Sequence, residues 1–166
     1  MFSDSNKNKE CDELTSRTLV IALGSNLGDS KSIFSSAIEE MAKRIPHYEF
    51  KVSSFIETEP VDCPAGSPPF LNGVVSMKWY PDCPLSEAVE TLLTTLQAIE
   101  VSAGRIPKKI LNEARPLDLD IIDVEGYQHK SKRLVIPHPR ACQRNFVLEP
   151  LKEILPGYEV GKGFMA

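Results

Sequence analysis

The sequence contains few cysteines and no C-x-x-C pair, which argues against a zinc site and against a thioredoxin-like redox site. Reduced thiols in a cytoplasm are the expected state. No apolar run approaches the roughly 20 residues that span a bilayer. Residues 1–17 are polar and lack the apolar segment of a secretory signal, so we expect a flexible N-terminal extension. The four cysteines are Cys11, Cys63, Cys83 and Cys142.

Glycine-rich phosphate-binding motifs are also missing. There is no G-x-x-x-x-G-K-[ST] P-loop and no G-x-G-x-x-G after a predicted strand. The motifs H-E-x-x-H and G-x-S-x-G and the kinase catalytic loop are absent as well. If the protein handles a nucleotide, side chains must therefore supply the positive charge that holds the phosphates.

Charge is unevenly distributed along the chain. The formal net charge of −4 disfavours a general nucleic-acid binder, which is normally basic. Between Arg105 and Arg144, however, nine Lys and Arg residues stand against five Asp and Glu residues. This locally positive quarter includes a pair of aspartates, a combination that fits an anionic ligand bound together with a metal ion.

The composition is that of a folded domain. Apolar residues make up 42% and charged residues 25% of the sequence, so residues 18–166 are predicted to form a single domain with a substantial core. The βαββαβ order, with additions, predicts an α+β, ferredoxin-like fold with the helices packed on a mainly antiparallel sheet. Ser30 or Ser32 is the expected N-cap of the first helix. Strands are expected at residues 19–23, 48–55, 71–79, 115–124 and 133–136, and helices at 30–45, 84–100 and 140–154.

The stretch from Arg115 to Val124 carries two carboxylates on a predicted strand. Side chains alternate along a strand, so Asp118 and Asp120 point the same way while Leu119 points into the opposite layer. Like charges this close repel each other unless a cation lies between them. Mg²⁺ meets this demand, because it prefers one or two carboxylates completed by substrate phosphates. The alternative, which a bare D-x-D pattern leaves open, is an edge strand with a solvated acidic face.

Five ordered blocks of sequence, which together span about Leu19 to Pro156, carry a family resemblance. They are Ala22–Gly28, Val52–Phe55 with Thr58 and Pro60, Phe70–Asn72, Arg115–Ile122, and Ile136–His138 with Arg144–Leu148. In these blocks the chain resembles the 6-hydroxymethyl-7,8-dihydropterin pyrophosphokinase family of folate biosynthesis. The resemblance implies transfer of the terminal pyrophosphate of ATP to the hydroxymethyl group of a reduced pterin, with release of AMP. It also implies two Mg²⁺ ions held by Asp118 and Asp120.

The resemblance assigns further residues to the two substrates. Arg105 and Arg115 are implied to contact the triphosphate and to stabilise charge as the β-phosphorus is attacked. Asp120 is implied to act with them in catalysis, and either this carboxylate or a metal-bound hydroxide is left as the general base. The residues implied to bind ATP are Gln97, Glu100, Arg105, Lys108, Arg115, His138 and Arg144. Those implied to bind the pterin are Thr58, Val61, Phe70, Asn72 and Phe146, whose two phenylalanines would sandwich the ring.

The sequence departs from the family pattern just before Arg115. Asn112 stands where a tryptophan usually helps to close a loop over the bound substrates. This departure leaves the mechanics of loop closure open. The two aspartates and two arginines of the implied chemistry are unaffected by it.

Two other classes of function are weighed against this one. Polymerase-β-type nucleotidyltransferases also carry Gly-Ser after a strand and a later D-x-D. In those enzymes the aspartates follow the Gly-Ser pair closely in the sequence, whereas here Ser25 and Asp118 are 93 residues apart. A catalytically silent ferredoxin-like binding module should lack the paired aspartates. The expected partners are therefore the small molecules ATP and 6-hydroxymethyl-7,8-dihydropterin, with no nucleic acid and no membrane. A monomer is expected.

Overall fold

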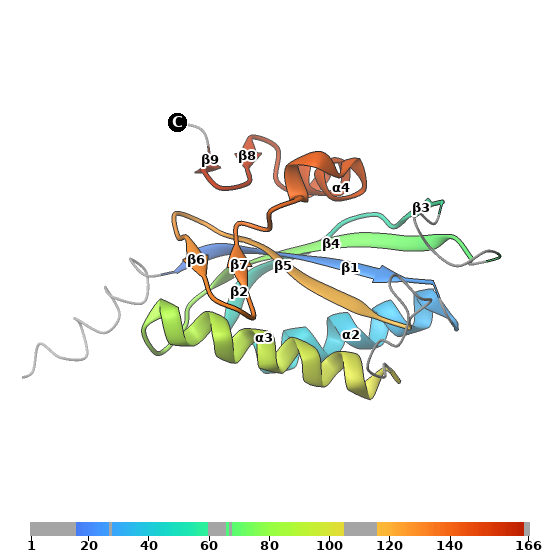
Figure 1. Ribbon diagram of the computed structural model, residues 1–166, viewed down its shortest axis with the longest axis horizontal. Coiled ribbons are helices and arrows are strands. Elements are labelled where there is room, and N and C mark those ends of the chain that lie inside the picture. Colours follow the sequence, from blue (N-terminus) through green and yellow to red (C-terminus); the bar gives the residue numbers. More distant parts are fainter. Residues whose placement is uncertain (1–15, 27, 60–65, 67, 105–115, 165–166) are drawn as a thin grey trace, which may run out of the picture.

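The computed structural model describes residues 16–26, 28–59, 66, 68–104 and 116–164, which form a sheet with helices on both sides (Figure 1). Within these ranges, no helix combines the length and the apolar character that a membrane span requires. The elements in chain order are β1 (Arg17–Ser25), α2 (Ser30–Arg44), β2 (His47–Val52), β3 (Ile56–Thr58), β4 (Phe70–Trp79), α3 (Leu85–Ser102), β5 (Asp118–Val124), β6 (His129–Lys130), β7 (Val135–Ile136), the 3₁₀ helix η1 (Ala141–Gln143), α4 (Asn145–Ile154), β8 (Tyr158–Glu159) and β9 (Gly163–Phe164).

The central sheet is antiparallel. Its strands follow the order β2-β4-β1-β5, and β3 also pairs with β4. β1 pairs with β4 along its whole length and with β5 on its other side, so that Gly24 lies opposite both Asn72 and Asp118. β5, which carries both aspartates, is the last strand at its edge. This arrangement confirms the predicted α+β fold with helices on a mainly antiparallel sheet.

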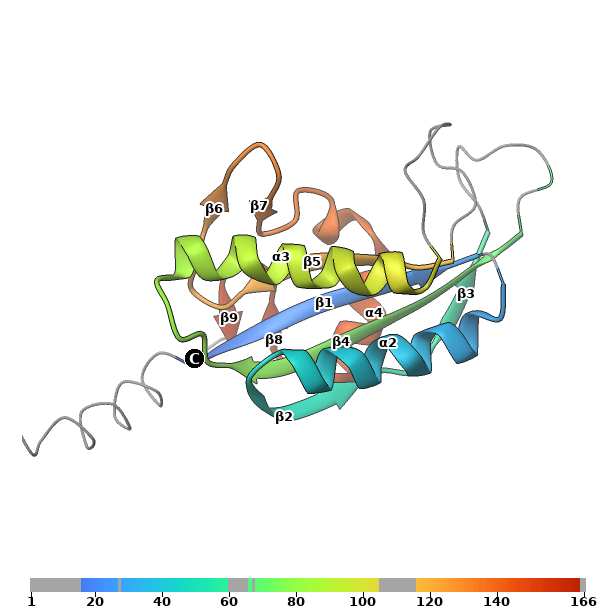
Figure 2. The ribbon, with the colours of Figure 1, turned by 90° about the horizontal axis from the view of Figure 1, so that it is seen from below.

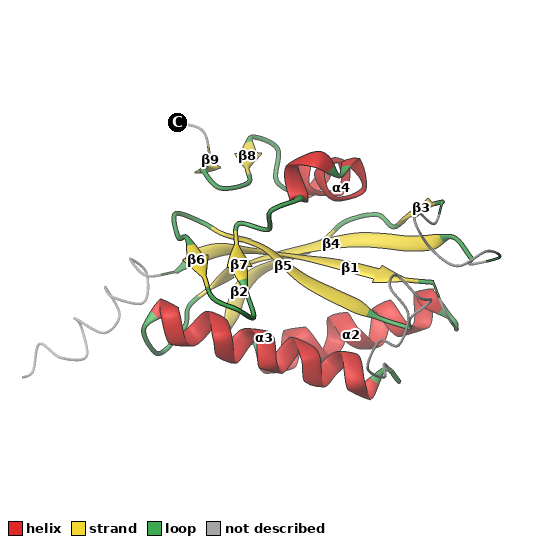
Figure 3. Ribbon diagram, viewed as in Figure 1, coloured by secondary structure: helices red, strands yellow, loops and turns green. Residues whose placement is uncertain are grey.

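Alternating side chains of β1 divide the molecule into two packing layers. Leu19, Ile21 and Leu23 belong to the core shared with α2 and α3, which cover one face of the sheet (Figures 1 and 2). Val20 and Ala22 belong to a second apolar cluster on the other face, where α4 and the C-terminal strands pack (Figure 3). Because α2 and α3 occupy one face, the functional side chains of β5 must lie on the face that α4 shares.

The boundaries of three elements differ from the sequence predictions. The strand predicted at residues 48–55 ends at Val52, because the Ser53 hydroxyl accepts the hydrogen bond of the Val74 N–H at 2.9 Å and the next strand begins only at β3. The helix predicted at residues 140–154 is split into η1 and α4 at Arg144, whose backbone is extended, with φ −118°. Asp29 caps α2 in place of the predicted serines, since its carboxylate accepts from the Ser32 N–H at 3.3 Å.

Candidate active site

Asp118 and Asp120 lie at the start of β5, on the sheet face away from α2 and α3. Both side chains are half-buried, and their partners across the strand pair are Gly24 and Ala22. Residues directly opposite each other in antiparallel strands share a face of the sheet. Two small residues therefore lie beside the two carboxylates on this face of the sheet.

Gly24 is the point where a predicted metal ligand and two predicted pterin-binding residues meet. A Cβ atom placed on this glycine would lie 3.8 Å from Asn72 Oδ1, 4.0 Å from the Cβ of Asp118 and 4.0 Å from Cδ1 of Phe70. Phe70 and Asn72 belong to β4, and Asp118 belongs to β5. The strands on both sides of β1 thus contribute side chains to one patch.

The carboxylate pair of β5 fits Mg²⁺ bound together with a substrate. Across the described ranges, no group of three or more His, Cys, Asp and Glu side chains is arranged to hold a metal ion by protein ligands alone. Mg²⁺ usually takes one or two carboxylates and completes its octahedron with water and phosphate oxygens. A structural Zn²⁺ would instead require about four protein ligands, mostly nitrogen and sulfur. The residues present therefore suit the metal that the resemblance implies.

Glu100, predicted to bind ATP, lies in the last turns of α3 with only 7% of its surface exposed. Its Oε2 accepts a hydrogen bond of 2.7 Å from the backbone N–H of Leu119. Leu119 separates Asp118 from Asp120, so this contact fixes the backbone of the D-x-D segment. The geometry gives Glu100 a positioning role that the sequence did not indicate.

His138 and Arg144 lie on the α4 side of β5. The His138 N–H donates to the carbonyl of Ile122 at 2.8 Å, which anchors the histidine beside the strand of the aspartates. Burial lowers the pKa of His138 below its usual 6.5, and the positive charges of Arg144 and Arg140 lower it further against the opposing effect of Asp118. The Arg140 N–H donates to His138 Nδ1 at 3.2 Å. A neutral ring at pH 7 would then carry its proton on Nε2, where it can donate to a phosphate oxygen.

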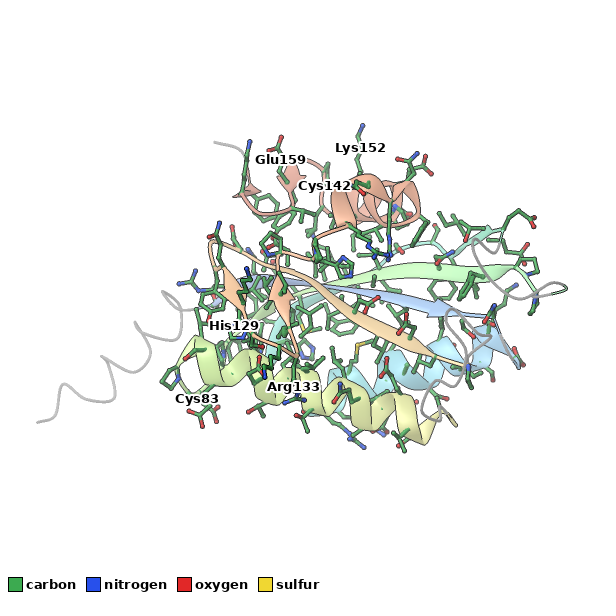
Figure 4. The ribbon with its side chains drawn as sticks, in the orientation of Figure 1. Cys83, His129, Arg133, Cys142, Lys152 and Glu159 are labelled. Carbon is green, nitrogen blue, oxygen red and sulfur yellow. The ribbon has the colours of Figure 1, made fainter. Side chains whose placement is uncertain are left out.

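Gln97 is exposed on α3, where Arg133 reaches it from the segment between β6 and β7. Arg133 Nη2 donates to Gln97 Oε1 at 3.2 Å and to Thr94 Oγ1 at 3.1 Å. Figure 4 shows the labelled His129 and Arg133 extending from this hairpin toward α3. Apart from its place in the basic stretch, no sequence signal pointed to Arg133, because the contact depends on the β6–β7 hairpin (residues 129–136) folding back on α3.

Asn72 and Thr58 are joined directly in the pterin-binding half of the site. Asn72 is buried, and its Nδ2 donates to Thr58 Oγ1 at 2.8 Å. Phe146, at the start of α4, is half-buried against the second apolar cluster, with the guanidinium carbon of Arg144 5.6 Å from its ring centroid. The structure thus links Asn72 with Thr58 and Phe146 with Arg144. The predicted residues Val61, Arg105, Lys108 and Arg115 lie outside the described residues.

The fold is α+β, with two carboxylates at the start of the edge strand β5. Residues 20–156 match the family model described as 7,8-dihydro-6-hydroxymethylpterin-pyrophosphokinase. The chain belongs to this family.

Individual relatives agree with the family match. A 2-amino-4-hydroxy-6-hydroxymethyldihydropteridine pyrophosphokinase from Porphyromonas gingivalis is 37% identical over 82% of this chain and 89% of its own length. The enzyme of the same name from Bacillus subtilis is 36% identical over 81% of this chain and 75% of its own length. A crystal structure of wild-type Plasmodium falciparum HPPK-DHPS superposes with a TM-score of 0.61 over 89% of this chain and 43% of that chain. Its sequence identity of 14% supports the fold alone.

Proposed function

We propose that this chain transfers pyrophosphate from ATP to the hydroxymethyl group of 6-hydroxymethyl-7,8-dihydropterin, releasing AMP, as a step of folate biosynthesis. The observation that carries the proposal is the pair Asp118 and Asp120 beside Gly24, on a patch completed by Asn72 and Phe70. Family membership over residues 20–156 supports the same reaction.

The residues divide into a phosphate half and a pterin half. Asp118 and Asp120 would hold two Mg²⁺ ions, which neutralise phosphate charge and align the reacting oxygens when bound. His138 and Arg144 would donate to the phosphates, together with Arg105, Lys108 and Arg115 as the resemblance implies. Phe70 and Phe146 would stack on the pterin ring, while Asn72, Thr58 and Val61 would contact its edge.

The wide spacing of the basic residues favours attack on the β-phosphorus. A P-loop gathers its phosphate donors in one backbone cradle and needs to grip only a γ-phosphoryl group as it leaves. In this chain the basic side chains assigned to the phosphates by the resemblance are spread along the sequence, as Arg105, Lys108, Arg115 and, directly before α4, Arg144. Such a spread can hold the β- and γ-phosphates as one transferred unit, with AMP as the leaving group.

The wider setting of the enzyme is part of the proposal. Residues 18–166 would act as a single domain and a monomer in the cytoplasm, with ATP and the reduced pterin as partners. The Porphyromonas gingivalis relative, 89% of which aligns with this chain, has nearly the same extent. Gln97 would contact the nucleotide as the resemblance implies, while Glu100 would orient the aspartate segment through its bond to the Leu119 N–H.

Chromatography of the nucleotide products tests the proposal. Incubation of the protein with ATP, Mg²⁺ and 6-hydroxymethyl-7,8-dihydropterin should yield AMP in equal amounts with the pyrophosphorylated pterin. Omission of the pterin should abolish AMP formation. Stoichiometric ADP would make the protein an ordinary kinase, and free pyrophosphate with a nucleotidylated product would make it a nucleotidyltransferase. Binding of the pterin without turnover would indicate a silent binding module.

A further inference from the structure

A carboxylate of α4 is bonded to the connection between β2 and β3. Glu153 accepts from the Ser54 N–H at 3.0 Å through Oε1 and at 3.2 Å through Oε2, and its Oε1 accepts from the Ser54 hydroxyl at 2.8 Å. Hydrogen bonds to an ionised acceptor are stronger than those between neutral groups. The two residues are 99 positions apart, so the contact joins separate parts of the fold.

The segment that contains Ser54 is itself fixed to the sheet. Ser53 exchanges two hydrogen bonds with Val74 of β4, from its N–H to the Val74 carbonyl and from the Val74 N–H to its hydroxyl, each 2.9 Å long. Phe55 packs edge-on against Phe34 with ring centroids 5.0 Å apart. Ser54 lies between these two anchors, so it offers α4 an immobile point of attachment.

Helix geometry relates this attachment to Phe146. Glu153 follows Phe146 by seven residues in α4, which is close to two turns at about 3.6 residues per turn, so both side chains lie on one side of the helix. Pro150 lies between them inside the helix. Because proline has no N–H, it cannot donate to the carbonyl of Phe146, and the helix is less rigid there.

The remaining contacts of α4 with the sheet are apolar. Val147 and Leu151 belong to the cluster around Val74 and Ile122, and Pro150 is buried as well. These residues determine which face of the helix packs on the sheet. The bond from Glu153 to Ser54 adds a directional contact near the C-terminal end of the helix.

We infer that Glu153 is a positioning residue for the pterin: its bond to Ser54 fixes the C-terminal part of α4 against the β2–β3 connection, and so holds Phe146 toward the ring opposite the β3–β4 side of the site. The inference rests on the proposed function. The same bond ties α4 to the segment that leads into β3, where Thr58 contacts Asn72. Glu153 thereby sets the spacing between the two sides of the pterin site, without touching the pterin itself.

Steady-state kinetics of Glu153→Ala, Glu153→Gln and Ser54→Ala test the inference. Because both residues are exposed, we expect Glu153→Ala to raise the KM for the pterin by at most about fivefold, with the KM for ATP within about twofold of the wild type. Glu153→Gln keeps an acceptor oxygen and should recover most of the loss, which also protects the test if the alanine variant folds poorly. Ser54→Ala in the Glu153→Ala background should add little.

The matched control is Glu149→Gln, which removes the same charge from an exposed position on α4 and should leave both KM values unchanged. Direct titration of the pterin in the presence of α,β-methylene-ATP and Mg²⁺ should show the same order of affinities. An unchanged pterin KM in Glu153→Ala would overturn the inference, and so would equal rises in both KM values together with a lower melting temperature. In either case, AMP formation by the wild type would still support the proposed function. A wild type that forms no AMP would overturn both.

Discussion

Glu100 and Leu119 are joined by a 2.7 Å hydrogen bond from the backbone N–H between the two aspartates to a buried carboxylate of α3. Leu119 itself points into the core shared with α2 and α3, so its side chain and its backbone are held from the same layer. The placement of Asp118 and Asp120 on the opposite face therefore depends on a residue that approaches the strand from behind.

Glu100→Ala should impair both folding and metal use. The buried N–H of Leu119 would lose its charged acceptor, which should lower the free energy of unfolding by about 2 kcal/mol. Loosening of the aspartate pair should raise the Mg²⁺ concentration for half-maximal turnover by about tenfold. Glu100→Gln keeps an acceptor oxygen and should lose less of both. Glu87→Ala, an exposed change in the first turn of α3, serves as control, and equal Mg²⁺ dependence in all three variants would contradict the prediction.

Asp118→Asn and Asp120→Asn should each abolish turnover without unfolding the protein. Partners that only orient metal ligands already contribute about 10- to 100-fold, so loss of a ligand should reduce the rate by at least about 100-fold. The melting temperature should stay level or rise, because the change relieves repulsion between like charges on one face of β5. Circular dichroism melts and AMP assays on both variants check this, with the exposed Asp82→Asn as control. Near-normal turnover in either aspartate variant would rule out the metal assignment.

Acidification should weaken the attachment of the β6–β7 hairpin to α3. The hydrogen bond from His129 Nε2, 2.7 Å long, is the main reason that the pKa of Glu90 lies below its usual 4.5. Because the folded state favours the ionised carboxylate, its stabilising contribution is complete above pH 4.5 and is lost as the pH falls through the lower folded pKa. The protection factors of the hairpin amides, which compare their exchange with the intrinsic rate at the same pH, should therefore fall below pH 4.5 in the wild type.

Glu90→Gln is the variant that isolates this contribution. This variant should show the lower protection factors of the hairpin amides already at neutral pH. These protection factors should then change little on acidification. Glu87→Gln, on the same helix, should behave as the wild type. Identical exchange profiles for the wild type and Glu90→Gln would show that the hairpin is held by Arg133 and apolar contacts instead.

Tyr158→Phe should destabilise the C-terminal strands in a pH-dependent manner. The Tyr158 hydroxyl and the Gly161 N–H both donate to Asp123 Oδ2, at 2.5 and 2.9 Å. Burial nevertheless raises the pKa of Asp123 above its usual 3.8, so this carboxyl favours folding most below pH 3.8 and loses that contribution as the pH rises through its folded pKa. Loss of the hydroxyl leaves an ionised buried carboxylate with one donor fewer, at a cost of about 1–3 kcal/mol at neutral pH.

Urea denaturation at neutral pH and below pH 3.8 measures the difference. The destabilisation by Tyr158→Phe should shrink on acidification. Asp123→Asn, which keeps an acceptor oxygen without a charge, should show a smaller loss at neutral pH. An equal loss at both pH values would mean that only packing of the phenol ring matters.

The elements defined by local patterns were predictable, whereas contacts between distant segments were not. The apolar run at residues 19–23 indicated β1, and the D-x-D spacing on a predicted strand indicated β5 and the common direction of the aspartates. Glu100 looks like any solvated residue near a helix end until α3 is packed against β5. The break after Val52 depends on the Ser53 hydroxyl accepting a bond from β4. Assignment of Asn72 and Phe146 to a pterin required the family resemblance, since an isolated Phe is compatible with core packing.

β1 serves different purposes on its two faces. Its core-facing residues Leu19, Ile21 and Leu23 determine how much folded protein survives, whereas Ala22 and Gly24 determine how much space remains beside the aspartates. A methyl group on Gly24 would meet its neighbours at 3.8 to 4.0 Å, ordinary contact distances that the fold tolerates, but it would occupy the ligand's side of the strand. Substitutions at the core-facing positions of this strand should therefore change the amount of folded protein, whereas substitutions at Ala22 and Gly24 should change the turnover of each folded molecule.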